Sequence, residues 1–153
     1  MSRPARPRLQ PPASQPLPGD DLVSKPHFIA TRAVTIKAPA SVVWKWIIQI
    51  GSARAGWYSL DWIDNAGAAS SRKILPEFQK IEQGYFIPFT PDQKNGMWVK
   101  EYWEHEHVLW WDQKGHGTWG WYLGHQGESE TRLITRLRTR YDFSFPWIIY
   151  YVL

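Results

Sequence analysis

FIATRAVTIKAPASVVWKWIIQIG, residues 28–51, is the stretch that decides the fold. Its first eleven residues alternate in the manner of a half-buried strand, and the apolar face consists of Ala30, Val34 and Ile36. Pro39 ends this strand and suits the first turn of a helix, which we expect to continue to Gly51. That helix is apolar over most of its circumference, and its one polar stripe consists of Ser41, Lys45 and Gln49. A β–α unit is therefore expected at the start of a folded domain.

The second half of the sequence has the pattern of an antiparallel meander, because β-rich runs alternate with turns that contain Gly, Asp or Asn. The expected strands are 85–89, 97–103, 108–113, 118–125 and 131–143. A short helix is expected between the two halves, over residues 60–66, with Ser59 as its cap. The last strand carries a row of arginines that we expect on the solvated face of the sheet: Arg132, Arg136, Arg138 and Arg140. This order predicts an α+β fold in which a curved antiparallel sheet wraps around helices.

The composition of the 153 residues fits one globular domain, and its 11 Trp, 7 Tyr and 6 Phe supply a large apolar volume. Cys is absent, which excludes disulfides, thiol nucleophiles and Cys-based metal sites. The net charge of +4 is too mild to indicate nucleic acid binding.

Residues 1–26 differ from the rest, because they hold seven of the 12 prolines and few aliphatic side chains. Such a segment buries too little surface to fold, so we expect a disordered Pro-rich tail over 1–26 and a folded domain over 27–153. The tail lacks the apolar region of a secretory signal, and the chain lacks an apolar run of the length that crosses a bilayer. We therefore expect a cytoplasmic protein with no transmembrane segment.

Four blocks of the sequence carry a family resemblance. They are ATRAVTIKAPASVVWKWIIQIG from residue 30, GSARAGWYSLDWIDN from residue 51, ILPEFQKIEQG followed by IPF from residue 74, and TWGWYLGHQGESETRLITRLRTRYDF from residue 118. Through these blocks the chain resembles small bacterial members of the SRPBCC superfamily, the START-like helix-grip proteins of the polyketide cyclase/dehydrase and lipid transport type. The resemblance implies a seven-stranded antiparallel sheet that grips a long C-terminal helix, with a hydrophobic cavity between them.

The chain departs from this family pattern after Phe143, where only SFPWIIYYVL follows. We therefore expect a truncated C-terminal helix of two turns at most. Its apolar residues 145–153 are expected to dock over the concave face of the sheet. The alternative is that they extend away and mediate self-association or contact with a membrane surface.

Residues 54–65 place polar groups among large rings, which is the composition of a ligand pocket. A purely structural role is equally compatible with the pattern, with Ser59 and Asp61 as helix caps and Arg54 paired to Asp61 or Glu77. Tryptophans and a tyrosine of the later strands are expected in the core or lining the cavity. The complete set of candidate ligand-binding residues is Arg54, Trp57, Tyr58, Asp61, Trp62, Trp119, Trp121 and Tyr141.

Two further patterns are weaker. His105 and His107 lie two apart beside glutamates, as metal ligands on one strand face do, but a solvated turn is the favoured interpretation, and we expect no metal or cofactor. The arginine row and nearby tryptophans have the chemistry of a nucleic acid surface, yet a solvated sheet face is favoured, so no nucleic acid partner is expected.

The predicted function is binding or carriage of a hydrophobic small molecule, such as a lipid or a polycyclic or aromatic compound, without an assigned catalytic residue. The alternative is an enzyme of the aromatase/cyclase or dehydrase type. In that case Tyr58, Asp61 or Arg54 would supply proton transfer or oxyanion stabilisation.

Overall fold

The structure is a computed structural model, and it describes residues 15–58 and 69–141. No helix in these two ranges is long and apolar enough to cross a membrane. In chain order the elements are β1 (Phe28–Ile36), α1 (Ala40–Ile48), the 3-10 helix η1 (Pro76–Phe78), β2 (Phe86–Pro88), β3 (Gly96–Trp103), β4 (His107–Trp111), β5 (Gly117–Gln126) and β6 (Glu130–Thr139).

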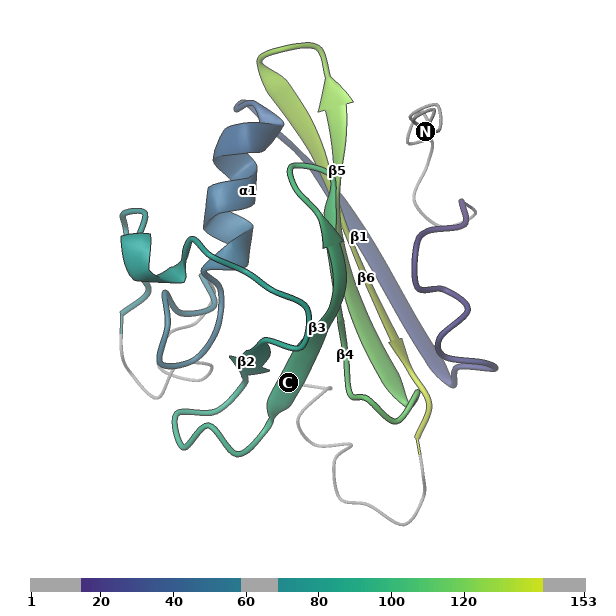
Figure 1. Ribbon diagram of the computed structural model, residues 1–153. Coiled ribbons are helices and arrows are strands. Elements are labelled where there is room, and N and C mark those ends of the chain that lie inside the picture. The colour runs from purple at the N-terminus through teal and green to yellow at the C-terminus, as the bar shows by residue number, and fades with distance from the viewer. Residues whose placement is uncertain (1–14, 59–68, 142–153) are drawn as a thin grey trace.

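The six strands form one curved antiparallel sheet with the order β1-β6-β5-β4-β3-β2 (Figure 1). Strands β2 to β6 follow one another as a meander, and β1 returns to pair with β6 along its whole length. The α+β class, the opening β–α unit and the five later strands are confirmed. The family resemblance implied a seven-stranded sheet, whereas the described residues supply six strands. The predicted helix over 60–66 and the C-terminal segment 145–153 lie outside the described residues.

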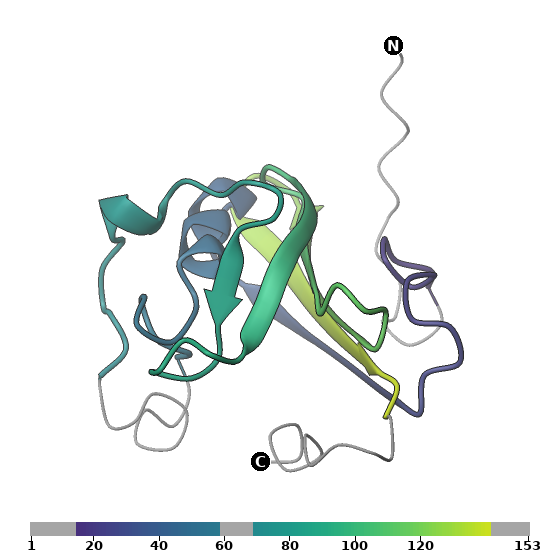
Figure 2. The same ribbon diagram turned by 60° about the horizontal axis from the view of Figure 1, so that its bottom comes forward.

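Helix α1 lies against one face of the sheet, which we call the inner face (Figures 1 and 2). Its buried side chains pack against apolar residues of β3, β4 and β5 in one continuous core. The members contributed by the helix are Ala40, Val43, Trp44, Ile47 and Ile48, and those contributed by these three strands are Met97, Val99, Val108, Trp110 and Leu123. Each such side chain stabilises the fold by about 1.5–3 kcal/mol when fully buried.

Strand β1 extends beyond this core. Ile36, at its end next to α1, packs against the core cluster. Val34 shares the predicted apolar face but is 52% exposed. β1 is therefore confirmed as a strand, whereas its expected apolar face is only partly covered, since Ala30 and Ile36 are half-buried and Val34 is exposed.

Residues 15–26, which we call the strap, cross the opposite face of the sheet, the outer face (Figure 1). Val23 is fully buried there, and Leu17 is 7% exposed. The Tyr122 hydroxyl donates a hydrogen bond to the Pro18 carbonyl oxygen at 2.6 Å. The prediction of disorder is therefore wrong for residues 15–26, and residues 1–14 lie outside the described residues. Composition alone predicted disorder because the apolar surface against which the strap packs belongs to strands far along the chain.

The strap also buries part of the arginine row of β6. Arg136 is 5% exposed, and its Nη1 lies 2.6 Å from Asp20 Oδ2 of the strap. Arg138 Nη1 lies 3.6 Å from the other oxygen of Asp20. The prediction of a solvated face is therefore wrong for Arg136, because the strap covers it and supplies the opposite charge that a buried guanidinium needs.

Candidate ligand-binding site

Three of the predicted ligand-binding residues, Trp57, Trp119 and Trp121, meet in an aromatic cluster on the inner face. The Trp119 ring lies between the other two, with ring centres 5.9 Å from Trp57 and 5.2 Å from Trp121, both stacked. Trp110 and Phe89 close the cluster through edge contacts with Trp119. Alternation along β5 explains the pair, since residues 119 and 121 point to the same face. Their role in binding a ligand stays a prediction.

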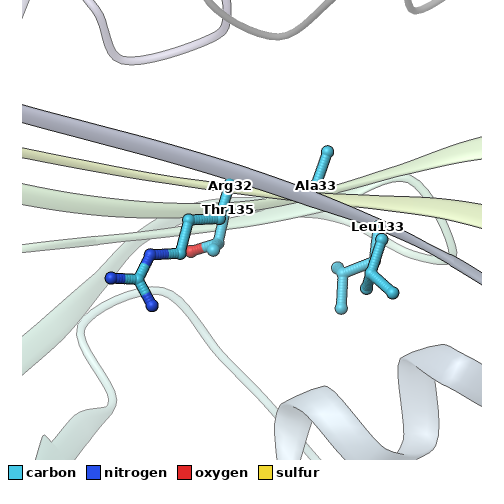
Figure 3. A pocket seen from close by; sticks show the side chains of 5 residues that line it. Arg32, Ala33, Leu133 and Thr135 are labelled. Carbon is cyan, nitrogen blue, oxygen red and sulfur yellow. The ribbon is translucent and has the colours of Figure 1, made fainter.

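A groove of about 320 Å³ lies beside this cluster, on the inner face of β1 and β6. Its lining consists of Arg32, Ala33, Val34, Leu133 and Thr135. Figure 3 shows the side chains of Arg32, Leu133 and Thr135 pointing to the side on which α1 lies, whereas Ala33 points the other way. Trp119 Nε1 donates a hydrogen bond to Thr135 Oγ1 at 2.6 Å, which joins the groove to the aromatic cluster.

Sequence reasoning missed the groove residues, although one signal was present. Arg32 has the same parity as the apolar residues of β1 and therefore lies on the inner face, directly opposite Thr135 in the ladder. An arginine on the apolar face of an alternating strand is unusual enough to mark a site. The partners of that face could not be read locally, because β6 lies about 100 residues further along the chain.

Arg54 is not at this groove but at the end of α1. Its Nη2 donates to the Ile48 carbonyl oxygen at 2.6 Å, and its Nε donates to the Ile50 carbonyl oxygen at 3.2 Å. Nη1 donates to the Tyr85 hydroxyl at 3.0 Å, and the guanidinium carbon lies 4.6 Å from the centre of the Phe78 ring. These contacts satisfy carbonyls at the helix C-terminus, where a cation is favoured.

The expected ion pairs of Arg54 are replaced by these contacts. Its side chain bonds to carbonyls and a hydroxyl instead of Glu77, and Asp61 lies outside the described residues. Burial lowers the pKa of Arg54, and the interaction with Tyr85 partly offsets this effect. An arginine retains its charge at neutral pH, so the group acts as a cationic cap in a partly buried position.

Tyr58 contacts residues at the end of α1. Its hydroxyl accepts a hydrogen bond from Gln49 Nε2 at 2.5 Å, and its ring meets the Trp46 ring edge-on at 5.8 Å. Gln49 is fully buried rather than solvated, and its Oε1 accepts from the Leu75 backbone N–H at 2.9 Å. This glutamine therefore ties the end of the helix to the loop that precedes η1. Its place in the polar stripe with Ser41 and Lys45 pointed instead to solvent.

The remaining candidates do not join the cluster. Tyr141 stacks on His27 with ring centres 6.0 Å apart, and its backbone N–H donates to His27 Nδ1 at 3.0 Å, next to the start of β1. Asp61 and Trp62 lie outside the described residues. The predicted set therefore divides into a tryptophan group on the inner face, a polar pair at the end of α1 and one tyrosine at the far end of β6.

His105 of the β3–β4 turn and His107 at the start of β4 point to different faces of the sheet. His105 meets Trp44 of α1 edge-on at 6.3 Å, whereas His107 stacks on Tyr122 of the outer face at 6.1 Å. The described ranges contain no group of three or more His, Cys, Asp or Glu side chains that could hold a metal ion. His105 instead borders a second pocket of about 380 Å³, which Lys45 and Glu104 also line.

Comparisons with known proteins find little that is similar. The sequence matches no protein-family model and no curated protein. A solved structure of a conserved protein of unknown function from Enterococcus faecalis is 18% identical, with a TM-score of 0.48 over 81% of this chain and 63% of that one. A polyketide-cyclase-like protein from Corynebacterium glutamicum is 15% identical, with a TM-score of 0.40 over 73% of this chain and 65% of that one.

The chain thus spans slightly less than two thirds of the length of both structures. Membership of the SRPBCC superfamily stays a prediction that rests on the sequence blocks.

Proposed function

We propose that the protein binds a hydrophobic small molecule, such as a lipid or an aromatic compound, in the inner-face groove. The observation that carries this proposal is an apolar groove that adjoins stacked tryptophans and leaves Val34 half exposed. Ligand pockets are mostly apolar concavities with a few polar groups that orient the ligand, and their volumes are about 300–1,000 Å³. The groove has this character at the small end of the range.

Binding is better supported than catalysis. The enzyme alternative uses Tyr58, Asp61 or Arg54, and the structure engages Arg54 and Tyr58 in hydrogen bonds with residues 48–50 at the end of α1. The polar side chains that line the groove are Arg32 and Thr135, and these two do not form an acid–base pair at neutral pH.

The test is a titration with a neutral hydrophobic fluorophore, N-phenyl-1-naphthylamine, together with native mass spectrometry for co-purified lipid. Val34→Asp places a charge in the groove, so we expect the dissociation constant to rise about tenfold, the equivalent of one lost apolar contact. Val42→Asp is the matched control, because Val42 is an exposed valine of α1 that does not line the groove. Circular dichroism should show both variants folded. Equal affinity of wild type and both variants would place the probe elsewhere and overturn the proposal.

A further inference from the structure

The Arg32 side chain differs from those of Arg54, Arg132 and Arg136 in its hydrogen bonding. Arg54 and Arg136 are each held by several hydrogen bonds, and Arg132 donates to the Thr35 hydroxyl on the outer face at 3.0 Å. Arg32 is exposed, and its side chain has no hydrogen bond or ion pair within residues 15–58 and 69–141. Its guanidinium nevertheless reaches over the same side of the sheet as Leu133 and Thr135 (Figure 3).

The chemistry around Arg32 favours an anion. Among the residues that line the groove there is no Asp or Glu, so the charge of Arg32 is not neutralised locally. Thr135 Oγ1 already accepts the Trp119 N–H, which leaves the Thr135 hydroxyl proton as a donor. A guanidinium fork and a hydroxyl donor next to apolar side chains match a carboxylate that is attached to an apolar body.

We propose that the ligand of the groove is an amphipathic organic anion with a single carboxylate. The carboxylate binds Arg32 and the Thr135 hydroxyl, and the apolar body lies along Val34 and Leu133 toward Trp119. This inference rests on the proposed function, since it assigns the ligand class of the same groove.

The test compares decanoate with decan-1-ol by isothermal titration calorimetry, because the two probes share a ten-carbon chain and differ in charge. We expect Arg32→Gln to weaken decanoate binding about tenfold, the scale of a charge-assisted hydrogen bond at a partly exposed position, and to leave decan-1-ol binding unchanged. Arg32→Lys should retain part of the affinity, since it keeps the charge without the fork. The preference for decanoate should shrink in 0.5 M salt.

Arg132→Gln is the matched control, because it removes the same charge from the neighbouring strand on the outer face. It should alter neither titration. If both probes bind equally well and Arg32→Gln changes neither, the anion inference is overturned while the proposed function stands. If neither probe binds, and the neutral fluorophore fails as well, the proposed function is overturned together with this inference.

Discussion

Adjacent register positions of β1 and β6 carry the same two residue types in opposite environments. On the outer face Thr31 is paired with Arg136, and on the inner face Arg32 is paired with Thr135. Arg136 donates to Thr31 Oγ1 at 3.0 Å and is buried beneath the strap, whereas Arg32 is exposed over the groove. The two pairs are near-identical in the sheet itself. What differs is the segment that covers each face, and this difference decides whether an arginine is structural or available to a ligand.

The strap supplies the carboxylate of Asp20 to the buried guanidinium of Arg136, whose other hydrogen bonds go to neutral acceptors. Removing one member of a buried ion pair costs more than the pair contributes, since the remaining charge is desolvated and unpaired. Loss of one member of the Asp20–Arg136 pair on the outer face should therefore be strongly destabilising.

The largest effect is expected for Asp20→Ala. This change leaves Arg136 buried without its carboxylate, so we expect the free energy of unfolding to fall by about 3 kcal/mol. Urea denaturation measures the loss. Asp21→Ala is the control, because Asp21 is an exposed neighbour on the same strap. Equal stability of the two variants would mean that the strap does not hold Arg136 in solution.

A smaller loss is expected for Gly19→Ala, which tests how closely the strap approaches the sheet. Gly19 has a φ of +88°, and a Cβ there would clash with Leu109 Cδ2. Together, the left-handed backbone and the clash should cost about 2 kcal/mol. Gly127 also has a positive φ, +73°, but a Cβ there would meet no atom within 4 Å. Gly127→Ala therefore measures the backbone contribution to the loss of stability alone. A thermal melt in which both variants lose the same stability would argue against close docking of the strap.

The smallest effect is expected for Tyr122→Phe, and it depends on pH. Burial raises the pKa of Tyr122 above its ordinary value. Above about pH 10 the unfolded chain loses this proton while the folded protein keeps it, so stability falls as pH rises. At pH 7 the variant should lose about 1 kcal/mol with the hydrogen bond to Pro18.

Urea denaturation at pH 7 and above pH 10 should show that the difference between wild type and Tyr122→Phe narrows in alkali. Tyr102→Phe, at a partly exposed position of β3, should show no such convergence. A constant difference between wild type and Tyr122→Phe at both pH values would contradict the assigned burial of the hydroxyl.

Local patterns predicted most of the sheet and little of the site. The meander was readable because alternation and turn residues are properties of neighbouring positions, and the predicted strands overlap β2 to β6 with shifts at their ends. The strap was not readable, because Leu17 and Val23 are buried by strands far along the chain. The sequence could not decide whether Arg54 has a structural or a ligand-binding role. Its partners include backbone carbonyls, and every residue carries one.

Trp119 and Trp121 were expected in the core or lining a cavity, and both pack against the core cluster, while a role in binding stays a prediction. Arg32 was missed because its availability to a ligand depends on its exposure in the folded sheet. A covering segment is a property of the whole fold, and the local sequence of β1 is compatible with either outcome.

The pairing of β1 with β6 also sets the order in which the chain can fold during synthesis. Hairpins between consecutive strands of the meander close short loops, whereas the ladder from Phe28↔Thr139 to Ile36↔Thr131 closes the longest loop of the sheet. At a translation rate of about 5–20 residues per second, roughly 5–20 s pass between the synthesis of β1 and that of β6. During that interval Phe28, Ile29 and Val34 belong to a β-prone strand without a partner, and the charge of Arg32 is the feature of this strand that disfavours pairing with other chains.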